Sequence, residues 1–293
     1  TIYRQSIISR ILTTSFIPIL DSEEKKAYQA TTKLQVICRM RYVVVGSTVN
    51  IPCVCKGTVS GRNPQTDVVP LKIVFATVSA TMTDYIAAEY SDIFNQQKVN
   101  FDERRELAEL VGNAIGRRQD QIILDAIAAA TAGTTVANTV VTSGSAAASD
   151  MNVGKIIAAA KALNAANVPA ADRHLVMHAN GLASLLADER AVSADYASIK
   201  ALTQGGGNVG SFMGFTIHVL GDMDEGGIAI DGSSDRTNFA FHKSAIGCGV
   251  GMSPSTKIDF IPEKTSFLVA STLSMGAVAI DANGIVDITT RES

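Results

Sequence analysis

The sequence predicts an α+β protein whose parts are too extended to share one compact core. Three observations carry this prediction: a β-rich, basic segment at 33–83, a helical pattern of about 30 residues at 100–131, and alternating helix and strand patterns at 150–255. An isolated two-stranded ribbon is only marginally stable in water. We therefore expect the ribbon to become stable by lying across another subunit, and the chain to be one part of an assembly.

The composition is that of an ordinary globular protein, and its charge is unevenly distributed. The 293 residues carry a net charge of −3, yet residues 1–66 hold nine Lys or Arg and only three Asp or Glu. A basic first quarter joined to an acidic body fits contact with nucleic acid, contact with the acidic body of a neighbouring copy, or chance clustering on a solvated surface. The net charge argues against a dedicated nucleic-acid binder.

Neither the apolar runs nor the cysteines point to a membrane or to secretion. No run reaches the roughly 18 apolar residues of a membrane-spanning helix, and Arg4 and Arg10 interrupt the apolar N-terminus. The chain has four cysteines, which we expect to be reduced thiols in a cytoplasmic setting. We read Cys53 and Cys55 as small buried side chains, because C-x-C without a second cysteine pair is a poor zinc signal.

Residues 1–32 show no clean period and are predicted to form an arm. From Lys33 onward, "KLQVICRMRYVVV" alternates apolar and polar residues, which predicts a strand with one apolar face. That face carries Val36, Cys38, Met40 and Tyr42. Turn residues at 46–47 and 61–67 separate it from a second strand and from a third, long strand, "VVPLKIVFATVSATMTDYIAA". Together these strands predict an elongated ribbon with basic side chains along it.

The stretch "NFDERRELAELVGNAIGRRQDQIILDAIAAATAG", from Asn100 to Gly133, predicts one unusually long helix. Asn100 is a suitable N-cap, and Glu103 three residues later completes a capping-box pattern. Apolar residues recur at intervals of three and four, and the charges fall on the opposite side. At 1.5 Å a residue, the helix is about 45 Å long. We expect a single element, at least over 102–128, that buries these residues against a sheet: Leu107, Val111, Ile115 and Ile122.

Residues 150–293 predict a mixed α/β region followed by closing strands. "DMNVGKIIAAAKALNAANVP" predicts a helix capped by Asp150, and "NGLASLLADE" and "SADYASIKAL" predict two more. "RHLVMHA" and "MGFTIHVL" predict buried strands, and residues 221–237 predict a loop. From 256 onward the sequence predicts two or three strands.

No segment carries a convincing signal for catalysis or cofactor binding. The run "GGGNVG" at 205–210 matches a dinucleotide fingerprint, but the helix and strand patterns around it stand in the reverse order. His174 and His178 would share a strand face, and we read them as structural because no third ligand stands at a useful spacing. No carboxylate pair stands out as an acid–base couple. The sequence therefore predicts a protein that is not an enzyme and has neither cofactor nor metal.

Three segments carry a resemblance to a known family: "NQQKVNFDERRELAELVGNAIGRRQDQIILDAIAAA" (95–130), "ADRHLVMHANGLASLLADERAVSADYASIKAL" (171–202) and "VGSFMGFTIHVL" (209–220). With the order of parts, they resemble the major capsid proteins of tailed bacteriophages, which have the Hong Kong 97-type capsid fold, and most of all those of short-tailed phages. The resemblance implies a part for each range: an N-terminal arm (1–32), an extended loop or E-loop (33–83), a peripheral domain (84–149 and 256–293) with its spine helix (100–131), and an axial domain (150–255).

The resemblance also implies a function and partners. The protein would be structural, and its hexamers and pentamers would build the icosahedral head around the double-stranded DNA of a tailed phage. The implied partners are further copies of the chain, a scaffolding protein during assembly, a portal protein, a decoration protein and, without sequence specificity, the packaged DNA. No membrane is among them. The implied location is the virion, and the cytoplasm of the bacterial host during assembly.

The chain departs from some relatives in two ways. It starts at the arm, which implies a separate scaffolding protein or the earlier removal of a scaffolding segment. Lys33 and Lys56 lie in the ribbon, but no motif identifies an acceptor for the lysine–asparagine cross-link that some relatives form. That chemistry is therefore not carried over to this chain.

Basic side chains of the ribbon and acidic side chains at the start of the long helix are the candidate inter-subunit contacts. The cations are Arg39, Arg41, Lys56 and Arg62, and the anions are Asp102, Glu103 and Glu106. We expect these cations to lie on the anions of a neighbouring copy, and packaged DNA is the alternative partner. Apolar ribbon residues such as Val43 and Val45 should still contribute most of the binding energy.

Two other functions remain open at this point. An encapsulin-like compartment has the same fold and loads an enzyme instead of DNA, so its purified shells would hold one protein and no genome. A soluble α/β enzyme would need a concave pocket with convergent polar groups within 150–255.

Overall fold

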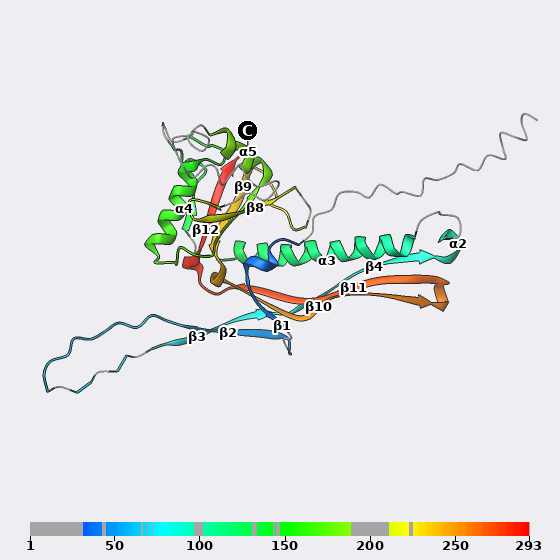
Figure 1. Cartoon of the computed structure of the whole chain (residues 1–293), viewed down its shortest axis with the longest axis horizontal. Helices are drawn as coiled ribbons and strands as arrows, with labels where there is room; N and C mark the ends of the chain where they lie inside the picture. The colour runs from blue at the N-terminus through cyan, green and yellow to red at the C-terminus, as the bar shows by residue number, and fades with distance from the viewer. Residues whose placement is uncertain are drawn as a thin grey trace, which may run out of the picture.

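The computed structural model describes residues 32–42, 45–65, 67–68, 70–71, 73–96, 102–130, 134–142, 144, 147–188, 211–222 and 225–292. Figure 1 shows three parts: a long helix that lies along a sheet, a six-stranded domain at one end of that helix, and a thin ribbon that projects beyond it. The arm at 1–31, the run at 205–210 and the helix predicted in "SADYASIKAL" lie outside the described residues. Within the described part, no helix is long and apolar enough to cross a membrane.

The long helix is α3, Glu103–Ala128, and it is one continuous element of 26 residues. The prediction of a single long helix is thus confirmed, but its ends differ from 100–131. Asp102 caps the helix by accepting a hydrogen bond from the Arg105 backbone N–H at 3.4 Å, so Asn100 is not the cap. Glu103 then sits too early to close a capping box, and it accepts a hydrogen bond from the Ser91 hydroxyl instead. At the other end, Ala129 closes the last turn with its N–H bonded to the Asp125 carbonyl.

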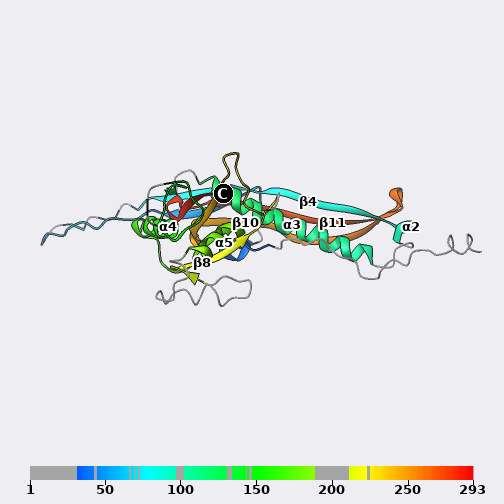
Figure 2. The ribbon, with the colours of Figure 1, turned by 90° about the horizontal axis from the view of Figure 1, so that it is seen from above.

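One side of α3 packs on a four-stranded sheet with the order β1-β10-β11-β4. Its strands are β1 (Arg39–Tyr42), β10 (Ile246–Ile261), β11 (Ser266–Ala279) and β4 (Thr83–Asp92). Val111 and Ile115 are buried as predicted, whereas Leu107 and Ile122 are only half-buried. The buried side of the helix is completed by Ile123, Leu124 and Ile127. We call α3 and these four strands the beam; from above, α3, β4, β10 and β11 run along the long axis (Figure 2).

Replacing Gly112 by Ala should stabilise the subunit. Gly112 lies inside α3, and no other heavy atom of the described residues comes within 4 Å of where its Cβ would stand. Alanine removes the entropic cost of a helical glycine, so we expect the free energy of unfolding to rise by about 0.5–1 kcal/mol. Urea unfolding of the unassembled subunit measures this change.

Gly154 is the matched control, because it also lies in a helix. A Cβ at Gly154 would stand 2.9 Å from backbone atoms of Thr142 and Val141, so Gly154→Ala should destabilise the subunit. Equal effects of the two substitutions would show that helix propensity, and not this backbone contact, decides the outcome.

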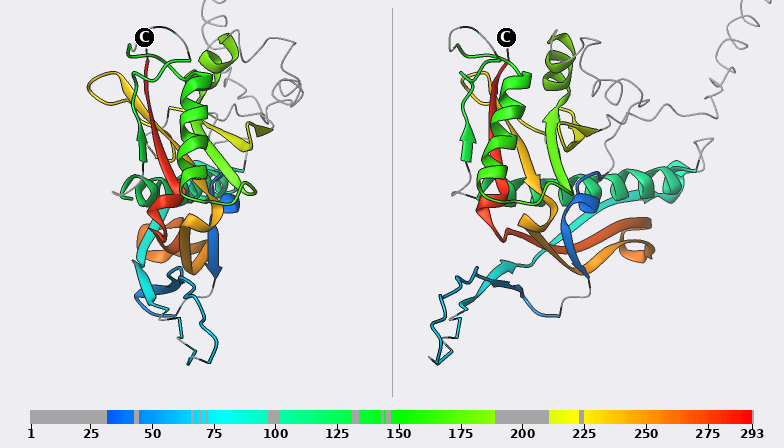
Figure 3. Two further views of the ribbon diagram at one scale, coloured as in Figure 1. Left: turned by 90° about the vertical axis from the view of Figure 1, so that its left-hand side faces the viewer. Right: turned by 60° about the vertical axis from the view of Figure 1, so that its left-hand side comes forward.

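The projecting ribbon is a two-stranded antiparallel hairpin of β2 (Thr48–Val54) and β3 (Phe75–Thr81). Its register pairs Thr48 with Thr81 and Val54 with Phe75. Figures 1 and 3 show it leaving the beam below the six-stranded domain and extending beyond it. We call residues 48–81 the ribbon from here on.

The prediction of three ribbon strands over 33–83 is wrong in its details. Gln35–Ile37 form a short 3-10 helix (η1), and β1 belongs to the beam because it pairs with β10. The long third strand is two strands, β3 and β4, which separate at Met82, whose N–H donates to the Ser47 carbonyl and closes the root of the ribbon. Cys53 is half-buried and Cys55 is exposed, so the expectation of two buried thiols fails for Cys55, which lies just past the end of β2.

The six-stranded sheet has the order β5-β12-β9-β6-β8-β7. Its strands are β5 (Thr134–Val136), β12 (Ile285–Arg291), β9 (Asp235–His242), β6 (Arg173–His178), β8 (Phe215–Leu220) and β7 (Ser211–Phe212). The helices beside it are α4 (Val153–Ala165) and α5 (Ala179–Ala187), and these elements form the six-stranded domain (Figure 3). The remaining short helices are α2 (Ile93–Gln96), η2 (Lys243–Ala245), η3 (Pro262–Lys264) and η4 (Ala282–Gly284).

Strand pairing divides the chain differently from the predicted ranges. β10 joins the beam from residue 246, whereas the prediction assigned 150–255 to one domain. β12 pairs with β9 and β5, so the end of the chain returns to the six-stranded domain and not to the beam. In addition, Asn152 caps α4, because its Oδ1 accepts from the Lys155 N–H at 3.0 Å, and the predicted cap Asp150 lies two residues too early.

A polar clamp joins the six-stranded domain to the beam. Arg118 on α3 lies over the ring of Tyr85 on β4, 4.5 Å from its centroid, and its Nη1 pairs with Glu225 at 3.2 Å. Beside it, the N–H of Gly226 donates to the side chain of Gln121 at 3.0 Å. The segment that follows β8 is therefore bound to the helix of the beam.

Candidate assembly surface

The ribbon carries an exposed row of apolar side chains that its own chain does not cover. Val54 is 61% exposed and Phe75, opposite it in the register, is 73% exposed. Further exposed apolar residues along and around the ribbon are Val45, Val59, Val68, Leu71, Ile73 and Val74. Single exposed apolar residues are ordinary, but this many on and around one thin projecting hairpin favour an interaction surface.

The beam carries a second exposed apolar group. Tyr85 and Ala87 of β4 pack on the α3 side, so the alternation of the strand places Ile86 and Tyr90 on the other face, where both are exposed. On β10, Met252 is also exposed, whereas the exposed Ile258 and Phe260 pair in register with Val269 and Phe267 and so stand on the α3 side of the sheet. Near the β10–β11 turn, Lys264 lies 4.0 Å from the ring centroid of Tyr90 and donates to its hydroxyl. One subunit therefore has two exposed apolar surfaces, one on the projecting ribbon and one on the beam.

The four predicted cations are all exposed, but they lie on two different elements. Arg39 and Arg41 stand on β1 in the beam, where they pair in register with Gly247 and Gly249. The other two, Lys56 and Arg62, stand on the ribbon beyond the end of β2.

The predicted anions lie at the start of α3, where they are engaged within their own chain. Asp102 caps the helix, Glu103 bonds to Ser91, and Glu106 is half-buried. The ribbon and the start of α3 lie at opposite ends of the molecule (Figure 1). A contact between the ribbon cations and these anions therefore has to join two different copies.

The hydrogen bonds that hold residues 32–34 against α3 were not predicted from the sequence. Asp120, buried in α3, accepts hydrogen bonds from the Thr32 hydroxyl (2.8 Å) and from the backbone N–H groups of Lys33 (2.8 Å) and Leu34 (3.1 Å). Burial raises the pKa of the Asp120 carboxyl, and these hydrogen bonds oppose that shift. Lys33 also donates to the Val219 carbonyl at 2.9 Å. A signal was present in the sequence, because Asp120 lies on the apolar side of the helix pattern, where a buried carboxylate needs hydrogen-bond donors.

The two histidines of "HLVMH" have polar partners within the fold. His174 Nδ1 lies 3.2 Å from His218 Nε2 on the neighbouring strand β8. Burial lowers the pKa of His174 to about 4, and the charge of His218 acts in the same direction. Burial, together with Lys33, also lowers the pKa of His218. Both rings are therefore neutral at pH 7, and one donates to the other.

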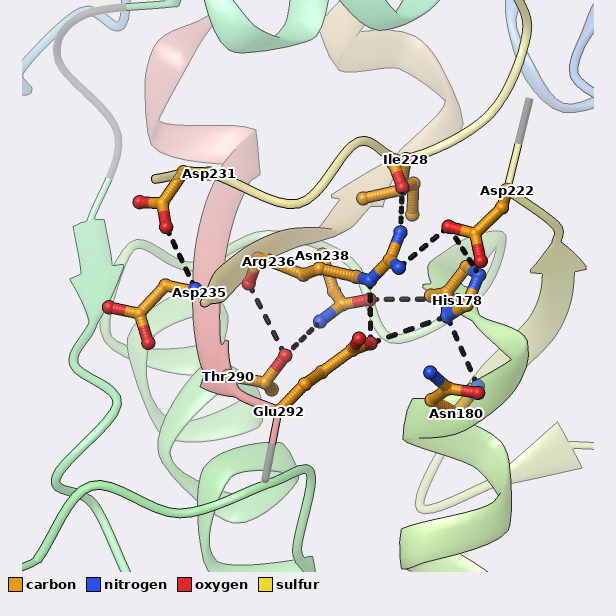
Figure 4. A network of polar contacts seen from close by, with 10 residues as sticks. All are labelled: His178, Asn180, Asp222, Ile228, Asp231, Asp235, Arg236, Asn238, Thr290 and Glu292. Carbon is orange, nitrogen blue, oxygen red and sulfur yellow. Dashed lines mark hydrogen bonds and ion pairs between the residues drawn. The ribbon is translucent and has the colours of Figure 1, made fainter. Parts of the chain in front are cut away.

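His178 belongs to a polar network that joins β6, β9 and β12 (Figure 4). At its centre, the buried Arg236 donates from Nε to Glu292 at 2.6 Å, pairs through Nη2 with Asp222 at 2.6 Å, and donates to the Ile228 carbonyl. The backbone N–H of His178 donates to Asn238 at 3.0 Å. The members of this network satisfy one another, which is typical of a structural network that fixes strand positions.

The described residues contain little that would serve catalysis. No group of three or more His, Cys, Asp or Glu among them could hold a metal ion. A cavity of about 240 Å³ lies between α3 and β9, lined by residues such as Leu124, Ile228 and Phe239. That volume is below the usual range of roughly 300–1,000 Å³ for ligand sites. Asp235, which lines this cavity, forms an ion pair with Arg291 at 2.5 Å.

Comparison with known proteins decides the class. The family model described as "Phage capsid protein" matches residues 12–292, nearly the whole chain. The chain belongs to the phage capsid protein family. No curated protein matches this capsid protein by sequence comparison.

Solved phage capsids show the same fold. The capsid structure of the cyanophage P-SCSP1u is 15% identical with a TM-score of 0.75, and the match covers 96% of this chain and 95% of that one. The head structure of Helicobacter pylori bacteriophage KHP40 is 12% identical, with a TM-score of 0.73 and coverage of 94% and 96%. A chain of Mycobacterium phage Che8 is 21% identical, with a TM-score of 0.68 and coverage of 94% and 97%. The predicted α+β, Hong Kong 97-type capsid fold is confirmed.

Family and fold together establish the general function. The capsid protein is a structural protein of the virion, it forms the shell of a phage head by assembling with further copies of itself, and it belongs to no enzyme family.

Proposed function

We propose that this capsid protein closes an icosahedral head around the double-stranded DNA of a tailed phage, with hexamers and pentamers as its units and the ribbon as the main tie between copies. The exposed apolar row of the ribbon carries this proposal. Val54 and Phe75 have no layer over them in their own chain, yet they stand on an ordered antiparallel hairpin. A hairpin that buries little in its own chain becomes stable when a neighbour covers it.

Apolar burial contributes more to this tie than charge does. Covering a Val or Phe side chain contributes about 1.5–3 kcal/mol, and the ribbon offers several such residues. An exposed ion pair contributes at most about 1 kcal/mol and is screened by salt. The apolar row therefore holds the ribbon in place, and the charges select where along a neighbour it lies.

The cations of β1 and of the ribbon supply that selection in the proposal. Arg39, Arg41, Lys56 and Arg62 would face the acidic start of a neighbour's α3, formed by Asp102, Glu103 and Glu106. The ribbon, which carries Lys56 and Arg62, and the start of α3 lie at opposite ends of one molecule, which supports a contact between copies for these two cations (Figure 1). In this arrangement residues 1–32 act as an arm, the ribbon as an E-loop, and the six-stranded domain as most of an axial domain. The kinship with short-tailed phages rests on sequence resemblance, as do the scaffolding, portal and decoration proteins as partners.

Charge reversal at Arg39 and Arg41 tests the charged part of the proposal. The variant R39E/R41E should form fewer empty shells than the wild type in the absence of DNA, with the largest difference at low salt, because it replaces two positive charges in the contact with two negative ones. Sedimentation and negative-stain microscopy of the purified protein measure shell yield.

Lys161→Glu provides the control, since Lys161 is exposed on α4 and outside the proposed contact. Its shell yield should match that of the wild type. Normal empty shells of R39E/R41E with defective DNA packaging would instead show that Arg39 and Arg41 face the packaged DNA.

A further inference from the structure

Three glycines form a bare patch on one face of the four-stranded sheet. Gly247 and Gly249 are two residues apart on β10, so they share a face, and Gly249 pairs in register with Gly276 on β11. Between and beside them, Cys248 and Val250 point to the other face and are buried in the core that includes α3. The sheet thus keeps apolar side chains on its helix side and removes them at one place on the other side. We call Gly247, Gly249 and Gly276 the glycine seat.

The root of the ribbon lies directly on the glycine seat. A Cβ at Gly249 would stand 2.2 Å from Cγ2 of Val49, and a Cβ at Gly247 would stand 2.2 Å from Cδ1 of Ile51. A Cβ at Gly276 would stand 2.3 Å from the carbonyl oxygen of Thr81. Each distance is far inside normal van der Waals contact, so a side chain at any of these positions would require the ribbon or its side chains to shift.

The ribbon residues on the seat are themselves fully packed. Val49 and Ile51 of β2 are buried, and with Ala80 of β3 they form a small separate core. Val278 and Ile280, which follow Gly276 along the chain, pack against this core and border the seat. The root is therefore held on several sides, whereas the rest of the ribbon projects freely (Figure 1).

We propose that the glycine seat sets the direction in which the ribbon leaves the subunit, and that Gly249 and Gly276 are positioning residues for shell assembly. The inference rests on the proposed role of the ribbon as the tie between copies. The ribbon acts as a lever: β2 alone extends about 20 Å at roughly 3.3 Å a residue, so a tilt of about 10° at the root moves its far end by about 3–4 Å. A displacement of that size misaligns apolar side chains with their place on a neighbour.

The three seat positions should differ in a defined order. At Gly276 the obstacle is backbone, which no side-chain rotation relieves. At Gly249 it is a β-branched side chain with few rotamers. At Gly247 the obstacles are the far ends of Ile51 and, at 2.9 Å, of Ile280, and both can turn away. Alanine should therefore disturb the ribbon most at Gly276, less at Gly249 and least at Gly247.

A pair of compensating substitutions tests whether the glycine seat sets the ribbon direction, so the test does not depend on a single variant. Gly249→Ala should displace the ribbon and abolish shells, and Val49→Ala in the same chain should restore both. The second substitution removes both γ-methyl groups of Val49 and leaves its Cβ 3.1 Å from the new methyl group, a tight contact that small shifts relieve. Val49→Ala alone completes the double-mutant cycle. Gly232→Ala is the control glycine, because no described heavy atom lies within 4 Å of its Cβ position.

Two readouts follow each protein. Shell yield is counted by negative-stain microscopy. Ribbon direction is measured on unassembled subunits by pulsed electron paramagnetic resonance, with spin labels on the exposed Cys55 and on E263C near the β10–β11 turn, in a C53S background. Cys38 and Cys248 are buried and do not take the label in the folded subunit.

We expect the label distance of G249A to shift relative to the wild type and that of V49A/G249A to return, with shell yield following the distance. If G249A proves insoluble, a folded V49A/G249A with the wild-type distance supports the seat equally. An unshifted distance in G249A and G276A, or a double variant as displaced as the single one, would overturn the inference. A wild-type chain that forms no shells would count against the proposed function alone, because the distance measurement needs no assembly.

Discussion

Cutting the ribbon back to its root should leave a folded capsid protein that forms no shells. The change removes residues 56–73 and joins Cys55 to Val74 through Asn-Gly, the pair preferred in two-residue hairpin turns. The join is short, because the Cys55 N–H already donates to the Val74 carbonyl at 3.0 Å. The described residues of the removed segment are all exposed, so the subunit loses no core. Circular dichroism and gel filtration should report a folded subunit, and negative-stain microscopy should show no shells.

A variant that keeps the full length of the ribbon distinguishes the effect of its apolar contacts from the effect of its length. Val59, Val68 and Leu71 are exposed, and replacing all three by Ser keeps the ribbon length while removing apolar surface. We expect a lower shell yield than for the wild type, since each lost contact forfeits about 1.5–3 kcal/mol of burial. Shells from the truncated chain at wild-type yield would contradict the role of the ribbon tip as a tie.

Replacing Arg236 by Ala should produce the largest loss of stability within one subunit. Arg236 is 4% exposed, and its removal leaves Glu292 and the Ile228 carbonyl without their buried donor (Figure 4). Removing one partner of a buried ion pair typically costs about 3–5 kcal/mol. We expect the lower end of that range, because the Glu292 side chain is 16% exposed and His178 Nδ1 still lies 3.4 Å from it. The free energy of unfolding of the unassembled subunit in urea measures the loss.

The same network supplies the control. The side chain of Asp222 pairs with Arg236 but is 68% exposed. In Asp222→Ala, Arg236 still pairs with Glu292, so the substitution should cost about 1 kcal/mol or less. Equal losses for the two variants would mean that the network acts through surface charge and not through buried donors.

The long helix shows what local sequence predicts well. Its length, its single continuous course and the burial of Val111 and Ile115 follow from a 3.6-residue period that the chain carries in one stretch. Its start does not follow, because Asn100 and Asp102 are both good caps. The contact of Glu103 with Ser91 on β4 comes from a distant part of the fold.

Features that depend on pairing between distant segments were beyond the sequence. The period of β12 predicts a strand but not its partner β9, so the end of the chain was assigned to the wrong sheet. The stretch "GCGVG" at 247–251 contains three glycines. Their reason lies in Val49 and Ile51, some 200 residues earlier in the chain, which occupy the space above Gly247 and Gly249.

The candidate contact residues were predicted in kind but not in arrangement. Exposed cations at Arg39, Arg41, Lys56 and Arg62 are present, yet the first two stand on β1 of the beam. Alternation in "KLQVICRMRYVVV" indicated a strand, and only the pairing with β10 shows that it is not part of the hairpin. A contact between these cations and another copy cannot be deduced from the order of residues within one chain.

A cryo-electron microscopy structure of the assembled shell would show directly whether the ribbon ties copies together. We expect Val54 and Phe75, both exposed in the single subunit, to pack on apolar residues of another copy, while Val49 and Ile51 stay on the glycine seat of their own chain. A shell in which Val54 and Phe75 remain open to solvent or pack only on their own chain would contradict this expectation.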